Sequence, residues 1–125
     1  MKKVITTTNA PAAIGPYSQA VQVGNLLFCS GMIAIDPHTQ LLNIDTIENE
    51  TKQVMDNIKN LLEAAGSSLD NVVKSTIFMK NMDNYVTINT IYATYFKVEP
   101  PAREAVEVSR LPRDVNVEIS IIAIV

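Results

Sequence analysis

Val115 to Val125 read VNVEISIIAIV, and this closing segment decides which kind of fold the chain can adopt. Up to Ile121, aliphatic residues alternate with polar ones, which is the period-2 pattern of a β-strand with one buried face. From Ile121 onward every residue is apolar, so the second face of this strand must be buried as well. The segment is therefore expected to be a strand that is covered on both sides.

Five more strands are expected from β-branched and aromatic composition and from turn residues. Two of them form a hairpin over residues 19–33, because Gly24-Asn25 accepts the positive φ of a two-residue turn. The other three are Val4–Thr8, Val72–Lys80 and Ala102–Val108. In the second of these three strands, we expect Val73, Ile77 and Met79 to share one face.

Two segments between the strands have apolar residues at helical spacing. The first helix begins near Asp45, which forms a capping-box pattern with Glu48, and it ends at Gly66. The second begins near Asp83 and ends before Pro100-Pro101, because proline cannot continue the hydrogen-bonding pattern. The expected buried stripes are Val54, Met55, Ile58, Leu61, Leu62 and Ala65 in the first helix, and Tyr85, Ile88, Tyr92, Tyr95 and Phe96 in the second.

These elements predict a single α+β domain over residues 1–125, with a mixed six-stranded sheet and two helices on one face. The helices can cover only one face of the sheet, whereas the closing strand is apolar on both. With no further helix in the chain, the simplest cover is another copy of the same sheet in a closed symmetric assembly. A homo-oligomer is expected, and the alternation does not distinguish a dimer from a trimer.

The composition argues against several classes of protein. Hydrophobic residues make up 47% of the chain and charged ones 18%, so a sizeable core can form. A net charge of −3, with no basic cluster longer than Lys2-Lys3, argues against nucleic acid as a partner. A single cysteine and a start without an apolar core favour a cytoplasmic location. The apolar run Ile121–Val125 is far shorter than the ~20 residues of a membrane-spanning helix, so no membrane role is expected.

The residues most often used in metal sites and triads give little support here. His38, the only histidine, lies in a turn and is expected to be exposed, which argues against a histidine-rich metal site. Nothing in the spacing places it beside Ser30 for a serine hydrolase triad. Cys29 alternates with Ser30 and is expected to lie in the core, as free cysteines usually do.

Two charged residues that interrupt apolar segments are the main candidates for chemistry. Arg103 begins a strand, where a guanidinium can clamp a carboxylate, or it can simply pair with Glu104 or Glu107. Glu118 shares a strand face with Ser120. In a pocket, partial burial would raise the pKa of Glu118 and suit it to exchanging protons with a bound water; on a solvated face it would have no such role.

Other polar residues could line a pocket. Asn89 falls on the helical face of Tyr85 and Tyr92, where it either satisfies buried backbone groups or faces a site. Tyr17 lies in the loop before the hairpin. Gly31, at the end of the hairpin, would let a ligand approach the backbone amides closely.

Several motifs resemble the RidA (YjgF) family in order and spacing, over essentially the whole chain. They are Asn9–Gln19 (NAPAAIGPYSQ), Ser30-Gly31, Val72-Val73-Lys74, Asn89 with Tyr92, Pro101-Ala102-Arg103, Leu111-Pro112 and Val117-Glu118-Ile119. The resemblance implies a chorismate-mutase-like homotrimer whose sheets form a central barrel with the helices outside. It also implies hydrolytic deamination of enamines and imines such as 2-aminoacrylate and 2-aminocrotonate. These substrates, released by pyridoxal-phosphate-dependent dehydratases, would bind between subunits without a cofactor.

The resemblance also assigns roles to residues. Arg103 would hold the substrate carboxylate, and Glu118 would position and help to activate the attacking water. The implied substrate-binding residues are Tyr17, Ser30, Gly31, Asn89 and Ala105. Departures from the family pattern, which bear on rate and substrate preference, are Met32, Glu104, Ala105 and Ser120.

Two other functions stay open. A non-catalytic regulatory module could bind 2-keto acids through the same Arg103. RNA cleavage or translation inhibition is also associated with the family, but the chain lacks the basic stripe that RNA binding requires.

Overall fold

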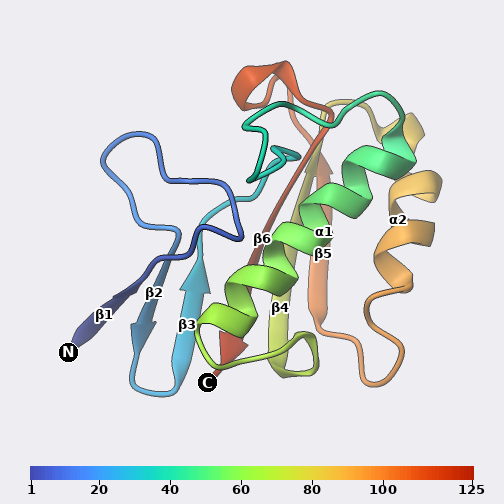
Figure 1. Cartoon of the computed structure of the whole chain (residues 1–125). Helices are drawn as coiled ribbons and strands as arrows, with labels where there is room; N and C mark the ends of the chain where they lie inside the picture. Colours follow the sequence, from blue (N-terminus) through green and yellow to red (C-terminus); the bar gives the residue numbers. More distant parts are fainter.

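Six strands form one mixed sheet in the computed structural model, which describes all 125 residues of the chain. The strands are β1 (Lys2–Ile5), β2 (Ala20–Val23), β3 (Leu26–Cys29), β4 (Val72–Met79), β5 (Ala102–Glu107) and β6 (Val117–Ile124). They lie in the order β1-β2-β3-β6-β4-β5 (Figure 1), and only the β4–β5 pair is parallel. The expected α+β fold is confirmed, with the closing strand β6 inside the sheet.

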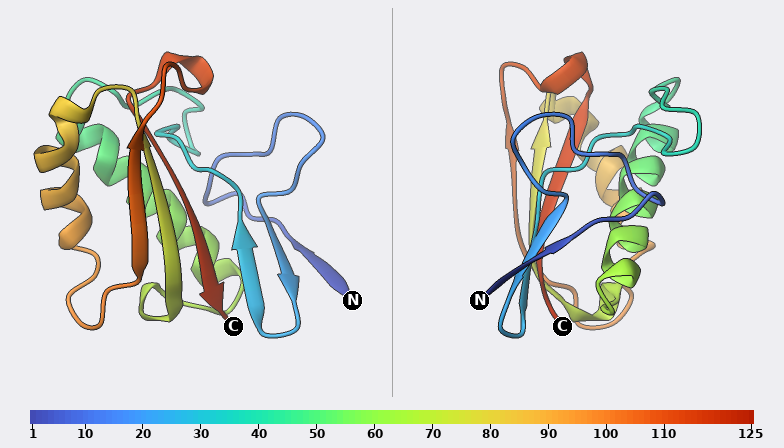
Figure 2. Two further views of the ribbon diagram at one scale, coloured as in Figure 1. Left: turned by 180° about the vertical axis from the view of Figure 1, so that it is seen from behind. Right: turned by 60° about the vertical axis from the view of Figure 1, so that its left-hand side comes forward.

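Helices α1 (Ile47–Ala64) and α2 (Tyr85–Ala93) cover the same face of this sheet (Figure 2). Most of the stripe predicted for α1 is at most 1% exposed, namely Val54, Met55, Ile58, Leu61 and Leu62. It belongs to the same core cluster as Val117 and Ile119 of β6, which are fully buried. Two helices on one face, as predicted, therefore leave the other face of the sheet uncovered.

The first strand lies earlier in the chain than expected. β1 ends at Ile5, whereas the predicted strand ran over Val4–Thr8. The Gln19 side chain explains the difference, because it accepts the Thr7 N–H at 2.8 Å and donates to the Thr7 carbonyl at 3.0 Å. Thr7 therefore bonds to a side chain instead of a neighbouring strand. The same amide donates to the Pro11 carbonyl at 2.7 Å and orders the loop that follows.

Strand β4 is irregular at its start. Its register against β6 shifts between Val72 and Lys74, and Val73 is left 40% exposed. The expectation that Val73 shares a buried face with Ile77 and Met79 is therefore wrong, although the latter two are buried. A local irregularity of this kind reverses one side chain without changing the rest of the strand.

The cap of α1 is one residue later than expected. The Thr46 hydroxyl accepts the backbone N–H of Asn49 at 3.0 Å, so Thr46 caps the helix. Asp45, the expected cap, instead accepts the N–H of Thr46 at 2.9 Å.

Helix α2 is shorter than expected. It ends at Ala93, so Tyr95 and Phe96 lie beyond it, although both still pack against the core. Thr94 ends the helix, since its hydroxyl donates to the Ile91 carbonyl at 2.7 Å and competes with the backbone pattern.

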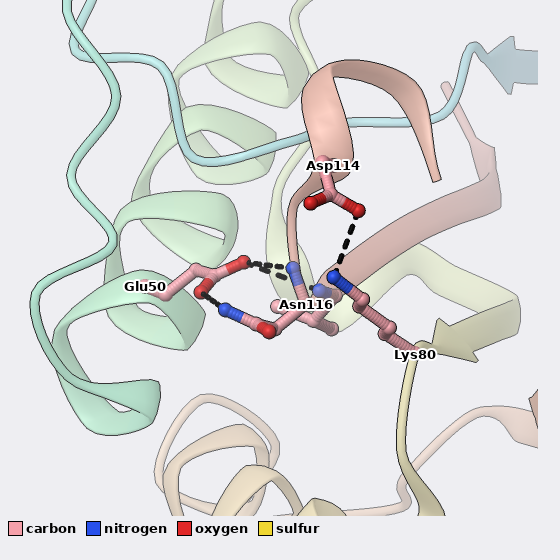
Figure 3. Close-up of polar contacts among 5 residues, drawn as sticks. Glu50, Lys80, Asp114 and Asn116 are labelled. Carbon is pink, nitrogen blue, oxygen red and sulfur yellow. Dashed lines mark hydrogen bonds and ion pairs between the residues drawn. The ribbon is translucent and has the colours of Figure 1, made fainter. Parts of the chain in front are cut away.

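A buried carboxylate joins α1 to the start of β6. Glu50 is fully buried, and its Oε2 accepts the backbone N–H of Asn116 at 2.7 Å and of Val117 at 3.2 Å. Its Oε1 accepts the Asn116 side-chain amide at 2.7 Å (Figure 3). The Asn116 N–H is thereby bonded outside the sheet, and β6 begins at Val117 rather than at Val115.

The face of the sheet away from the helices carries exposed apolar side chains. Phe28, Val106 and Ile124 are 43%, 40% and 42% exposed there, and Leu26, the register partner of Ile124, is 39% exposed. We call this surface the open face. It includes the second face of β6, for which the sequence predicts a cover.

Replacing Glu50 by alanine is expected to lower the free energy of unfolding by about 3 kcal/mol, because buried donors then lose their acceptor and each costs roughly 1 to 3 kcal/mol. Urea unfolding at one fixed protein concentration measures the change. Glu48→Ala is the control, since Glu48 is an exposed residue in the first turn of the same helix. If both variants lose the same small amount, the Glu50 bonds add no net stability.

Candidate active site

Arg103 lies on β5, on the face covered by the helices. Its Nη1 donates to the Oδ1 of Asn89 at 2.7 Å, and its Nη2 donates to the Tyr85 hydroxyl oxygen at 2.7 Å. Its Cζ lies 5.0 Å from the centre of the Tyr92 ring, within the range of a cation–π contact. We call these four residues the arginine half-site. Three of them, Asn89, Tyr92 and Arg103, border a cavity of about 420 Å³ that Phe96 also lines.

The arginine half-site contains the positive charge of Arg103 and no negatively charged side chain. The only ion pairs of the chain are Lys74–Glu104 at 2.9 Å and Lys80–Asp114 at 2.8 Å. The alternative in which Arg103 pairs with Glu104 or Glu107 is therefore wrong, since Glu104 points to the opposite face and Glu107 accepts the Met82 N–H. A half-buried guanidinium bonded only to neutral groups has donors left for a carboxylate.

Tyr92 adds no negative charge to this half-site. The Tyr92 hydroxyl donates to the Ser75 hydroxyl at 2.9 Å, which holds the ring under Arg103. Burial raises the pKa of Tyr92, and this effect is larger than the lowering caused by the Ser75 hydrogen bond and the Arg103 charge. The Asn89 side chain binds Arg103 instead of buried backbone groups. Of the two positions that the sequence left open for Asn89, the structure therefore has the one that faces the candidate site.

Glu118 lies on the open face, against Gly31. A Cβ added to Gly31 would lie 2.7 Å from the Oε1 of Glu118, so a larger residue here would force the Glu118 side chain to shift. Burial raises the pKa of Glu118, and no hydrogen bond lowers it. A partly buried carboxylate of this kind is suited to accept a proton from water near neutral pH.

Tyr17, Ser30 and Gly31 line a second cavity, of about 290 Å³. The Ser30 hydroxyl donates to the Ser18 carbonyl at 2.6 Å, and the backbone N–H of Ser30 donates to the Gln19 carbonyl at 2.9 Å. We call Tyr17, Ser30, Gly31 and Glu118 the carboxylate half-site. The structure thus brings together four of the seven residues predicted for the site.

The two half-sites lie on opposite faces of the sheet. Arg103 pairs in register with Ser75, and Glu118 pairs with Phe78 on the same strand. Ser75 and Phe78 are an odd number of residues apart on β4, so their side chains point to opposite faces. Ala105, the remaining predicted residue, shares the face of Arg103. One chain alone therefore does not bring Arg103 and Glu118 into one cavity.

Sequence reasoning missed two features of the site. Tyr85 was expected in the core, but its hydroxyl binds Arg103; its spacing from Asn89 on one helix face was the available indication. Arg113 lines the cavity of the carboxylate half-site and carried no indication in the sequence. As expected, His38 is exposed and Cys29 is buried, where burial raises its thiol pKa to about 12.

No three His, Cys, Asp or Glu side chains gather where they could hold a metal ion. Neither helix is long and apolar enough to cross a membrane.

Comparisons with known proteins cover almost the whole chain. The family described as Endoribonuclease L-PSP matches residues 7–125. A RutC family protein of Pyrococcus horikoshii is 54% identical over 123 residues, which cover 98% of each chain. The 2-iminobutanoate/2-iminopropanoate deaminase of Mus musculus is 47% identical over 124 residues, covering 99% of this chain and 92% of the mouse protein.

A solved structure agrees in fold. It is that of a protein of the conserved Rid protein family from Yersinia pestis, with a TM-score of 0.98, 50% sequence identity and 100% of both chains covered. Family match, sequence identity and structural similarity all extend over the motifs that the sequence analysis identified. The chain therefore belongs to the Endoribonuclease L-PSP family, which is the RidA family that those motifs resemble.

Proposed function

We propose that the protein hydrolyses reactive enamines and imines, such as 2-aminoacrylate and 2-aminocrotonate, to 2-keto acids and ammonia. The observation that carries the proposal is the half-buried Arg103, which is bonded only to the neutral groups of Asn89 and Tyr85. A substrate carboxylate would supply the missing negative charge. The name of the mouse relative, 2-iminobutanoate/2-iminopropanoate deaminase, supports the same substrate class.

We propose that the complete site forms between two chains of a homotrimer. Arg103 and Glu118 lie on opposite faces of one chain, so a shared cavity needs the arginine half-site of one copy beside the carboxylate half-site of the next. The apolar open face supports this assembly, because packing three such faces around a central barrel would bury Phe28 and Ile124.

In the proposed reaction, each half-site has one task. Arg103 holds the substrate carboxylate in a bidentate pair while Asn89 and Tyr85 fix the guanidinium, which orients the substrate. The enamine first tautomerises to the imine. Glu118 then takes a proton from a water whose oxygen adds to the imine carbon, and it passes this proton to the nitrogen, which gives a neutral carbinolamine. Glu118 next takes the hydroxyl proton of the carbinolamine and passes it to the nitrogen, so that the C–N bond breaks, the C=O bond forms and ammonia leaves.

The proposed substrates are products of pyridoxal-phosphate-dependent dehydratases, so we propose that the protein works beside such an enzyme in the cytoplasm. A non-catalytic module would instead bind 2-ketobutyrate through Arg103 without any turnover. RNA cleavage has less support, because the chain has a net charge of −3 and no basic stripe.

Arg103→Ala is expected to reduce the acceleration of 2-ketobutyrate release from a threonine dehydratase by about 100-fold, since the carboxylate loses its positioned charge. Arg103→Lys should fall in between, because lysine keeps the charge but cannot form the planar pair. Lys97→Ala, a change at an exposed residue between α2 and β5, is the control. Light scattering checks that each variant keeps its assembly. A wild type that gives no acceleration would show that the proposed deamination is wrong.

As the pH is lowered, activity is expected to begin to fall at a higher pH than it would if Glu118 had the pKa of an ordinary glutamate, which is about 4.3. The reason is that burial raises the pKa of Glu118, and only the ionised carboxylate can take a proton from water. The kcat/KM profile between roughly pH 4 and pH 8, at constant enamine supply, measures this limb. Glu118→Gln should remove the limb and lower kcat by about 100-fold. An acid limb that persists unchanged in this variant would assign the titration to another group.

A further inference from the structure

The carboxylate half-site opens into a cavity with a single charged lining residue, Arg113. The cavity measures about 290 Å³, near the lower end of small-molecule sites, which start at roughly 300 Å³. Half of its lining residues are hydrophobic, among them Ile33, Ile35 and Met32. A ligand part bound here would therefore meet apolar walls and one positive charge.

Arg113 has no partner within the chain. The next residue, Asp114, is the closest carboxylate in sequence, and it pairs with Lys80 at 2.8 Å (Figure 3). That pair holds the pKa of Asp114 below its ordinary value. The negative charge beside Arg113 is thus already matched by Lys80, and the guanidinium of Arg113 remains free to bind an anion.

The turn that carries Arg113 is fixed on both sides. Arg113 and Asp114 have φ values of 54° and 56°, in a region that residues other than glycine rarely adopt. After the turn, Val115 is fully buried and Asn116 is bonded to the buried Glu50 at 2.7 Å. Lys80 holds the turn from the other side through Asp114. The backbone at Arg113 is therefore set by its neighbours rather than by its own preference.

Gly31 connects this cavity to the reacting group. It lines the cavity, and it lies directly against Glu118, because a Cβ added to Gly31 would be only 2.7 Å from the Glu118 Oε1. If the reacting carbon of a substrate lies beside Glu118, the substrate side chain lies next to the cavity and can extend toward Arg113.

We propose that Arg113 binds a second carboxylate at the end of the substrate side chain, so that the site accepts imines of dicarboxylic amino acids. The inference rests on the proposed deaminase function. Arg103 of one copy would take the carboxylate next to the imine carbon, and Arg113 of the other copy would take the distal one. The apolar walls of the cavity accommodate the methylene group between them.

The test compares two imines made in place from D-alanine and D-aspartate by the matching D-amino-acid oxidases, with catalase present. Trapping with semicarbazide measures how fast 2-iminopropanoate and 2-iminosuccinate disappear. Arg113→Gln should reduce the acceleration of 2-iminosuccinate hydrolysis about tenfold, since a charge-assisted pair is lost. The acceleration of 2-iminopropanoate hydrolysis should change less than about twofold, because this substrate has no second carboxylate. Arg110→Gln is the matched control, because Arg110 is exposed in the same segment but does not line the cavity.

The outcomes separate this inference from the deaminase function. An equal loss on both imines, or no loss on either, overturns the role of Arg113, as does a wild type that acts only on 2-iminopropanoate. If the wild type acts on neither imine, deamination itself fails and calorimetry decides the role of Arg113. Weaker binding of 2-oxoglutarate by Arg113→Gln, with 2-oxobutanoate binding unchanged, would then support the second anion site, and equal binding would overturn it.

Discussion

Side-chain alternation along β6 is the constraint on which the rest of the structure depends. Its inward residues fill the core beneath α1, and its outward residue Glu118 reaches the open face. A slip of one residue would exchange the two sets and bury the carboxylate in the core. Reciprocal backbone bonds between Met32 and Ile119, at 2.8 and 3.1 Å, and the bonds from Glu50 at the start of the strand prevent such a slip.

Buried amides and carboxylates shape the irregular segments around the site. Gln19 bonds the loop that precedes the hairpin, and Asn57 of α1 donates to the carbonyls of Ile33 and Ile35 at 3.2 and 2.9 Å. Both segments form walls of the cavity beside Gly31. Because buried polar groups must be satisfied, these side chains set the backbone where no ladder of strand or helix bonds does.

The strands and helices could be predicted because each depends on a repeating pattern, and β6 and the buried stripe of α1 have the clearest ones. Features that depend on a single residue could not be predicted. The cap at Thr46, the outward turn of Val73 and the end of β1 all depend on side-chain bonds or pairing shifts that no periodicity records. The sequence alone indicated that Arg103 and Glu118 are charged residues within apolar segments. Their placement on opposite faces was not, since it follows from strand pairings that only the folded chain defines.

Both edges of the sheet carry charge, which bears on how copies of this chain can associate. β1 presents Lys2 and Lys3 at one edge, and β5 presents Glu104 and Glu107 with Pro100-Pro101 before it at the other. Charged residues and prolines at sheet edges discourage strand-to-strand pairing between molecules. The charges and prolines thus protect the two free backbone edges against fibre-like growth, whereas the apolar open face stays unprotected.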